Sequence, residues 1–400
     1  PMHRLLQGDV GAGKTVVALY ALLRAVETGR QAALMAPTET LAEQHFLTVD
    51  ELCAGLGVRV ELLTSSLRAR EHANVRQLIA SGDALLVVGT HALIQKEVEF
   101  RDLAVVVVDE QHRFGVGQRS ALAEGRSPHV LHMTATPIPR TLALTVYGDL
   151  DVSELAVLPE NRKPVITRRI PEERASEAYT RLTRLLHEGR QAYVVCPLIE
   201  QSETTRARAA EAEAERLRAH ELRDFEVGCL HGRLKTADRR ELMARFKARE
   251  LDVLVATTVI EVGVDVPNAT VMIVQEADRF GLAQLHQLRG RVGRGAEQSY
   301  CLLVSREQEE LTENAVERLD AMVATTDGFE LAERDLEIRG EGQLLGARQS
   351  GWSDLRFVRF RHDYELLERA RAAAQAVFDE GLLAEDVDRL LGEAEHLGAS

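Results

Sequence analysis

GDVGAGKT, residues 8–15, is the stretch that says most about how this chain folds. A loop that wraps a polyphosphate must bring backbone N–H groups close to charged oxygens, and a Cβ atom at the wrong place blocks that approach. Lys14 can then place its charge on the β- and γ-phosphates, and the Thr15 hydroxyl can join the shell of a Mg²⁺ ion. The spacing G-x-x-x-x-G-K-T therefore predicts a nucleotide-binding phosphate loop, whose glycines are Gly8, Gly11 and Gly13.

The residues on either side of this loop support the prediction. The apolar pair within residues 3–7 predicts a short strand, and residues 16–29 have a helical periodicity that ends at Gly29. A glycine turn that arises by chance is the alternative, and the flanking strand and helix disfavour it. A phosphate loop by itself predicts only that a nucleotide binds.

Length and composition set the class of protein. The 400 residues, 45% of them hydrophobic, suffice for two or three domains with their own cores. No apolar run approaches the roughly 18 residues that cross a membrane, and no signal peptide is visible, so we expect a soluble, cytoplasmic protein without a membrane partner.

The cysteines lie far apart and mostly in apolar runs, which favours buried thiols over disulfides or metal ligands. They are Cys53, Cys196, Cys229 and Cys301.

The charge balance argues against a general binder of polyanions. With 63 acidic and 49 basic residues, the formal net charge is −14. Any binding to nucleic acid must therefore depend on the local placement of Arg, Lys and helix N-termini.

Strand-like and helical runs alternate along the chain in two successive blocks. The apolar runs of the first block lie at 32–37, 84–90, 104–110 and 129–136, and those of the second at 191–200, 227–232, 252–258, 270–276 and 299–305. Such alternation predicts two α/β domains in series, each a parallel sheet covered by helices on both faces. We also expect a hinge at 158–168, a solvated helix at 203–225 and mainly helical structure after Ser305.

The run VVVVDEQH, residues 105–112, carries the second signal. Its valines predict a buried strand, and Asp109 and Glu110 emerge at the carboxyl end, where open α/β sheets bind ligands. Asp109 can hold Mg²⁺ through water, and Glu110 can orient or deprotonate the water that attacks a phosphate. Two carboxylates after a strand can also be simply solvated, but the phosphate loop favours the catalytic interpretation. The run TAT, 134–136, ends another strand and places small hydroxyl side chains beside the nucleotide.

The segment QLHQLRGRVGRG, residues 284–295, is the third signal. Its pattern Q-x-x-G-R-x-G-R begins at Gln287 and brings the guanidinium groups of Arg291 and Arg294 near one another. Such arginines can neutralise charge on the γ-phosphate in the transition state. A surface cluster paired with acidic neighbours is the alternative for an isolated RGR. The catalytic interpretation implies a site that closes only when the two domains meet.

Together these motifs resemble those of the superfamily 2 helicases, and more closely those of the RecG family of branched-DNA helicases. The stretches that carry the resemblance follow the family order: GDVGAGKT, APTETLAEQH, VGTHAL, DEQH, TATPIPRT, VLVATTVIEVGVDVPNA, QLHQLRGRVGRG and DLEIRGEGQLLGARQSG. The resemblance covers nearly the whole chain. It implies an α/β fold of two tandem RecA-like P-loop domains, at 1–157 and 158–305, followed by a mainly helical C-terminal region at 306–400.

The resemblance also implies roles for single residues. Catalysis would involve Lys14, Glu110, Arg291 and Arg294, Mg²⁺ would be bound by Thr15 and Asp109, and ATP would be contacted by the phosphate loop, Asp265 and Gln287. DNA contacts are expected from Thr38, Gln44, Thr90, His91, His231, Gly232 and Arg233, although each can also be explained as a helix cap or turn. Coupling of hydrolysis to motion is expected from His112, Thr134, Thr136, Arg339 and Gln349.

The tail resembles a motif that RecG shares with the transcription-repair coupling factor. Residues 327–351 match this TRG motif, understood as a helical hairpin and loop that transmit motor strokes to DNA movement, with RGEG where RGPG is more usual. Basic and aromatic residues interleave at 356–363, which we interpret as a half-buried amphipathic element rather than a base-stacking surface. The N-terminal wedge domain of the family and the helix before the phosphate loop have no counterpart in these residues, and the chain begins at Pro1, so we expect a fragment of a longer protein.

The activity implied is an ATP-dependent double-stranded DNA translocase that reverses forks and migrates Holliday junctions in recombination and repair. A monomer is expected, with branched duplex DNA as partner and single-stranded DNA-binding protein as a further candidate. One alternative is the motor of a transcription-repair coupling factor, whose partner is RNA polymerase. Another is a nucleotide-dependent scaffold without turnover, which the combination of Glu110 with paired arginines disfavours.

Overall fold

The computed structural model describes residues 1–95, 97–110, 128–134, 150–155, 163–197, 203–257 and 266–339, together with residues 369, 372, 373 and 376. The chain divides into two compact units, one of residues 1–137 with 150–332 and one of 138–149 with 333–400. Both sheets belong to the first unit. The domain boundaries expected at 157 and 305 stay predictions.

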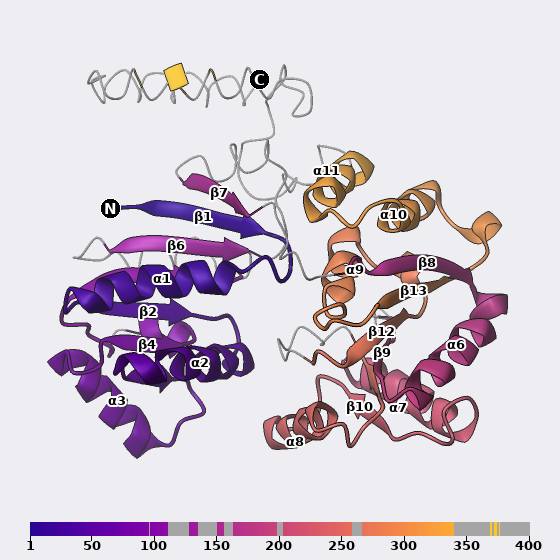
Figure 1. Cartoon of the computed structure of the whole chain (residues 1–400), viewed down its shortest axis with the longest axis horizontal. Coiled ribbons are helices and arrows are strands. Elements are labelled where there is room, and N and C mark those ends of the chain that lie inside the picture. Colours follow the sequence, from indigo (N-terminus) through magenta and orange to yellow (C-terminus); the bar gives the residue numbers. More distant parts are fainter. Residues whose placement is uncertain are drawn as a thin grey trace, which may run out of the picture. The chain divides into compact units, whose positions relative to one another are not determined.

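The first sheet is parallel and has seven strands in the order β3-β4-β2-β5-β6-β1-β7 (Figure 1). Its strands are β1 (His3–Gly8), β2 (Gln31–Met35), β3 (Val60–Leu63), β4 (Leu86–Gly89), β5 (Leu103–Val108), β6 (His129–Thr134) and β7 (Asp151–Leu155). Among the described residues its helices are α1 (Lys14–Glu27), α2 (Glu39–Cys53) and α3 (Ala69–Ser81). We call this part the first lobe.

The second sheet is parallel and has six strands in the order β10-β11-β9-β12-β13-β8 (Figure 1). Its strands are β8 (Ile166–Pro171), β9 (Gln191–Val195), β10 (Val227–Leu230), β11 (Val253–Ala256), β12 (Ala269–Val274) and β13 (Tyr300–Ser305). The helices of this second lobe are α6 (Ala175–His187), α7 (Glu203–Ala219), α8 (Thr236–Lys247) and α9 (Leu282–Arg289), and α10 (Glu313–Ala324) and α11 (Gly328–Arg339) follow it.

The cores explain why these runs become strands. In the first lobe Leu34, Val88 and Val107 are at most 1% exposed, and they pack with Leu22 of α1. In the second lobe a matching cluster joins the strands to Leu182 of α6. Strands buried on both faces require continuous apolar runs, which is the pattern that predicted them. The two parallel sheets confirm the predicted fold class.

Two local predictions were wrong in their extent. The expected hinge at 158–168 overlaps β8, because Ile166 and Thr167 pair in parallel with Tyr300 and Cys301 at the edge of the second sheet. β-branched residues at a sheet edge outweigh the charges and prolines before them. The helix expected at 203–225 ends at Ala219 and a turn follows.

The cysteine thiols are free in the structure, as the sequence predicted. Cys53, Cys196 and Cys301 are buried and Cys229 is half-buried. Burial raises the pKa of Cys301 to about 12, so this thiol stays protonated near neutral pH. In the described part of the chain, no helix is long and apolar enough to span a membrane.

Candidate nucleotide site

The phosphate loop connects the end of β1 to the start of α1. A Cβ atom at Gly8 would lie 3.0 Å from Leu155 Cβ and 3.1 Å from its carbonyl oxygen, so a larger residue would require β7 to shift by a few tenths of an ångström. Gly11 and Gly13 adopt left-handed backbone conformations, with φ of 79° and 90°. Gly13 is also the N-cap of α1, so the first backbone N–H groups of that helix face the loop. The loop therefore presents the donors that a phosphate needs.

Replacement of Gly13 by alanine should destabilise the protein, because the left-handed region penalises a Cβ atom by about 1–2 kcal/mol. The free energy of unfolding in urea should fall by about this amount, and ATP affinity should fall with it. The matched control is Gly55→Ala, since Gly55 has no positive φ and no atom within 4 Å of an added Cβ. Equal unfolding midpoints for Gly13→Ala and the wild-type chain would contradict the assignment of strain to this loop.

Lys14 is folded back over the loop. Its Nζ donates hydrogen bonds to the carbonyl oxygens of Gly8, at 2.8 Å, and Asp9, at 2.9 Å. Burial lowers the pKa of Lys14, and the charges of Asp109 and Glu110 oppose this effect. The ammonium group thus lies among carboxylates of the first lobe.

Asp109 is held in a fixed orientation directly after β5. Its N–H donates to the carbonyl oxygen of Met35 at 2.8 Å, which extends the pairing of β5 with β2. Its Oδ2 lies 2.7 Å from Nε2 of His45 on α2, and its Oδ1 accepts from the N–H of Glu110 at 3.0 Å. The Asp109 carboxylate and the Thr15 hydroxyl in the first turn of α1 are the hard oxygen donors that Mg²⁺ prefers, so they fit this ion.

Glu110 has a φ of 51°, in the left-handed region that residues other than glycine rarely adopt. Such a conformation costs of order 1–3 kcal/mol and persists where the surrounding structure enforces it. The β5 strand and the bond from the Glu110 N–H to Asp109 provide that enforcement. The chain therefore leaves the direction of β5 at Glu110.

The segment after α9 meets the phosphate loop. A Cβ atom at Gly290 would lie 2.8 Å from Cβ of Val10, so glycine permits the two backbones to approach. The positive charge of Arg294 contributes to lowering the pKa of Lys14, although burial of Lys14 has the larger effect. Arg294 Nε donates to the carbonyl oxygen of Gly290 at 3.3 Å. Arg294 of the second lobe and the carboxylates of Asp109 and Glu110 in the first lobe therefore all act on the charge of Lys14.

Arg291 and Gln287 accompany these groups on the same segment. Both side chains are half-buried: Gln287 lies on α9, and Arg291 lies two residues after the end of that helix. Asp265, the expected ribose contact, lies outside the described residues.

The expected DNA-contacting residues follow the carboxyl ends of β2, β4 and β10. Thr38 caps α2 by accepting from the N–H of Leu41, and Thr90 is buried and accepts from the N–H of Ala92. In the second lobe His231 Nε2 lies 3.0 Å from a carboxylate oxygen of Glu211. Gln44 is half-buried, and the exposed members of the set are His91, Gly232 and Arg233. Helix capping therefore accounts for the two threonines, and the DNA contacts stay predictions.

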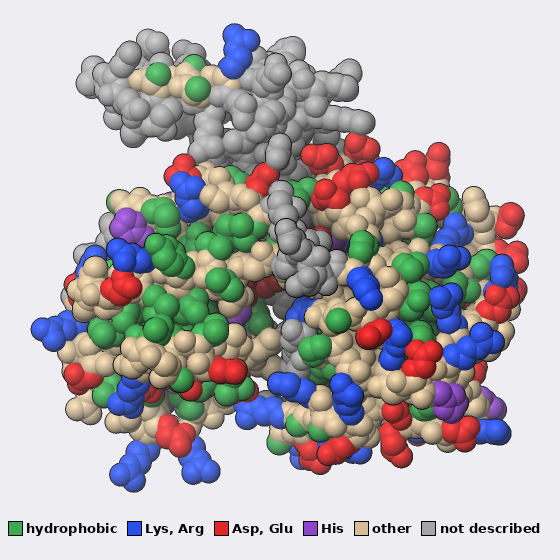
Figure 2. Space-filling view, viewed as in Figure 1, with side chains coloured by type: hydrophobic (Ala, Val, Ile, Leu, Met, Phe, Trp, Pro, Cys, Tyr) green, Lys and Arg blue, Asp and Glu red, His purple; other side chains and the backbone are tan. Residues whose placement is uncertain are grey.

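The face shown in Figure 2 has no single basic patch: its Lys and Arg side chains are interspersed with acidic ones. On α1 and α2, Tyr20 and Leu47 are 68% and 66% exposed. A distributed charge pattern agrees with the acidic composition, because any contact with DNA must then depend on particular groups rather than on a general positive field.

Of the expected coupling residues, Thr134 ends β6 and is buried. Arg339 ends α11, in the second compact unit. The remaining three, His112, Thr136 and Gln349, lie outside the described residues.

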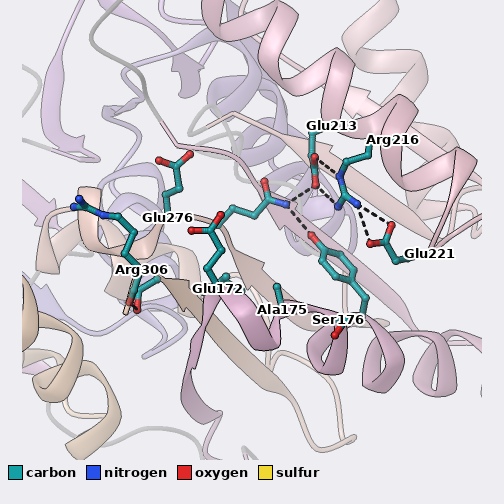
Figure 3. Close-up of a pocket in the computed structure, with 12 residues that line it drawn as sticks. Glu172, Ala175, Ser176, Glu213, Arg216, Glu221, Glu276 and Arg306 are labelled. Atoms are coloured by element: carbon teal, nitrogen blue, oxygen red, sulfur yellow. Dashed lines mark hydrogen bonds and ion pairs between the residues drawn. The ribbon is translucent and has the colours of Figure 1, made fainter. Parts of the chain in front are cut away.

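A separate cavity of about 390 Å³ lies at the carboxyl ends of β8, β12 and β13 (Figure 3). Gln275 Nε2 donates to the hydroxyl oxygen of Tyr179 at 2.7 Å and to Glu213 Oε1 at 2.5 Å. Arg216 pairs with Glu213 and with Glu221, each at 2.8 Å. These polar side chains bind one another, which is the arrangement of a structural network rather than of a phosphate site.

Sequence reasoning missed Asp9 and His286, which join the lobes, and Arg289, which contacts His286. His286 Nε2 lies 2.7 Å from Asp9 Oδ1, although the two residues are 277 positions apart. The sequence did contain one indication of this contact. A carboxylate inside a phosphate-binding loop repels the ligand, so Asp9 needs a hydrogen-bond donor beside it.

Comparison with known proteins agrees with this geometry. The DEAD/DEAH box helicase family matches residues 2–145, and the helicase conserved C-terminal domain matches residues 177–296. The family described as ATP-dependent DNA helicase RecG, domain 3, C-terminal, matches residues 325–389. The ATP-dependent DNA helicase RecG of Streptococcus pneumoniae is 52% identical over 377 residues, which are 94% of this chain and 55% of that protein. This chain belongs to the RecG family.

Other RecG proteins match to a similar degree. RecG of Escherichia coli K12 is 50% identical over 95% of this chain and 55% of its own length. A solved structure of RecG bound to a three-way DNA junction has 42% sequence identity and a TM-score of 0.74, and the match covers 92% of this chain and 48% of that one. The chain thus spans about half the length of the RecG relatives it matches. These matches do not favour the coupling-factor alternative.

More distant relatives share the fold alone. A structure of Saccharomyces cerevisiae Dbp5 bound to RNA and ADP BeF3 has a TM-score of 0.58 at 17% identity, and the match covers 93% of this chain and 89% of that one.

Proposed function

We propose that this chain is the ATP-hydrolysing motor of a RecG-type enzyme and that it moves on branched duplex DNA. The observation that supports this most is the shared site. Lys14 and the carboxylates of Asp109 and Glu110 come from the first lobe, and Arg294 comes from the second. A site divided in this way links the chemistry of ATP to the relative position of the lobes.

In the proposed reaction, Glu110 accepts a proton from the water that attacks the γ-phosphorus. The bond between that phosphorus and the oxygen of ADP breaks, and ADP and phosphate leave. Lys14 and the arginines Arg291 and Arg294 neutralise the charge that develops on the phosphate oxygens. Thr15 and Asp109 would hold Mg²⁺, which supplies further charge neutralisation when it is bound.

Movement would follow from closure and release. ATP binding would draw Arg291 and Arg294 onto the γ-phosphate, and hydrolysis would release them, so that the DNA-contacting surfaces of the two lobes advance past one another. The junction-bound RecG structure supports branched DNA as the substrate class. We further propose that the protein acts as a cytoplasmic monomer, and that single-stranded DNA-binding protein is a second partner.

The test is strand displacement from a three-way junction. With ATP the chain should release a labelled strand, whereas a non-hydrolysable ATP analogue and the Glu110→Gln variant should release none. Turnover of ATP without strand displacement from the junction would contradict the motor assignment. ATP-dependent binding of the junction without turnover would instead favour a scaffold.

A further inference from the structure

The contact between Asp9 and His286 is buried and direct. Their side chains are 16% and 5% exposed, and Oδ1 and Nε2 lie 2.7 Å apart. Asp9 lies in the phosphate loop of the first lobe, and His286 lies on α9 of the second. Beside them, Val10 packs against the position of Gly290. The second lobe therefore contacts the phosphate loop through a hydrogen bond between the side chains of His286 and Asp9.

Arg289 determines which ring nitrogen of His286 carries the proton. A guanidinium group can only donate, and Arg289 Nη2 lies 3.0 Å from His286 Nδ1, so Nδ1 accepts. In the neutral ring Nε2 then carries the hydrogen and donates it to Asp9. Burial alone would raise the pKa of Asp9, but the hydrogen bonds from His286 and from the Val10 N–H, together with the positive charge of Arg289, act in the opposite direction, and the pKa of Asp9 is lowered.

The remaining donors of Arg289 bind the start of the tail. Nη1 donates to the carbonyl oxygens of Met322, at 3.0 Å, and Thr325, at 2.7 Å, and Nη2 donates to Thr326 at 3.2 Å. These carbonyls belong to the end of α10 and to the connection before α11. Arg289 is 3% exposed, so its contacts take place away from bulk water, where an unmatched charge is costly.

We propose that Asp9, His286 and Arg289 are positioning residues that set Arg291 and Arg294 relative to the phosphate loop and fix both to the connection between α10 and α11. Arg289 lies two positions before Arg291, and His286 lies five before it, on the same segment. Loss of the hydrogen bond to Asp9 releases the end of α9, and the arginines with it. This inference rests on the proposed ATP hydrolysis.

The first test measures kcat for ATP in His286→Ala, made in the wild-type chain and in the double variant Arg291→Ala/Arg294→Ala. In the wild-type background His286→Ala should lower kcat about tenfold, and in the double-variant background it should lower kcat little further, because both arginines that it would misplace are already absent. A general loss of stability would instead lower kcat by the same factor in both backgrounds, which would overturn the proposal. His286→Gln keeps a donor near the position of Nε2 and should restore most of the activity. The exposed His220 provides the matched control, His220→Ala.

A second test does not depend on hydrolysis. Urea unfolding of Asp9→Ala, His286→Ala and the double variant should give non-additive losses, since each single change removes the same hydrogen bond. Additive losses would overturn the pairing. A wild-type chain without turnover would defeat the proposed function, and in that case the unfolding cycle alone would decide whether Asp9 and His286 are coupled.

Discussion

Replacement of Glu110 by glutamine should lower steady-state ATP hydrolysis by about 10²–10⁴-fold, the contribution typical of a general base. Glutamine keeps the size of the side chain and a hydrogen-bonding oxygen, but it cannot accept the proton of the attacking water. ATP binding should change little, because Lys14 and the glycines of the loop are intact. A phosphate-release assay and titration with a fluorescent ATP analogue give the two quantities.

The control for this variant is Glu51→Gln, an exposed carboxylate on α2. It makes the same chemical change away from the site and should leave both quantities unchanged. If Glu110→Gln hydrolyses ATP at the wild-type rate, then the positive φ of Glu110 has no connection with catalysis and another group activates the water.

Replacement of Arg294 by alanine should lower kcat by about 10³-fold or more, because an arginine finger stabilises charge that exists only in the transition state. Its positive charge already acts on Lys14, so its position agrees with a phosphate held there. Arg291→Ala should have an effect of the same order. ATP affinity should fall much less than kcat, since the ground state carries less charge at the point of contact.

Arg223→Ala is the matched control, because Arg223 is a surface residue whose side chain is 75% exposed. It should hydrolyse ATP at the wild-type rate. A result in which Arg294→Ala raises KM and leaves kcat intact would mean that the arginine binds ATP but does not act in the transition state.

Much of the fold and of the nucleotide site could be predicted from sequence, because the motifs that indicate them are local. GDVGAGKT predicted the loop, and the valines of β5 predicted the strand that carries Asp109 and Glu110. The contact of Asp9 with His286 could not be predicted in this way, since it depends on how two lobes pack across 277 positions. The end of α7 was missed for a different reason: residues 220–225 continue the helical composition, and the turn depends on packing of the nearby Leu222 into the core.

The hydrogen bond between His45 and Asp109 could not be predicted from sequence either. His45 is buried on α2 together with Ala42 and Val49, at the spacing of an ordinary core position, so nothing in its sequence context marks it as a partner of Asp109. The structure adds that its Nε2 orients the carboxylate expected to serve Mg²⁺. A residue that orients a site from a neighbouring helix can be identified only when the order of the strands in the sheet is known.

The central claim is that the two lobes build one ATPase site that responds to duplex DNA. The most direct measurement is steady-state ATP hydrolysis by this chain with and without a forked duplex, beside Glu110→Gln and Arg294→Ala. Turnover should rise when the fork is added and should be lost in both variants. A folded chain that binds ATP but hydrolyses none, with or without DNA, would contradict the shared site.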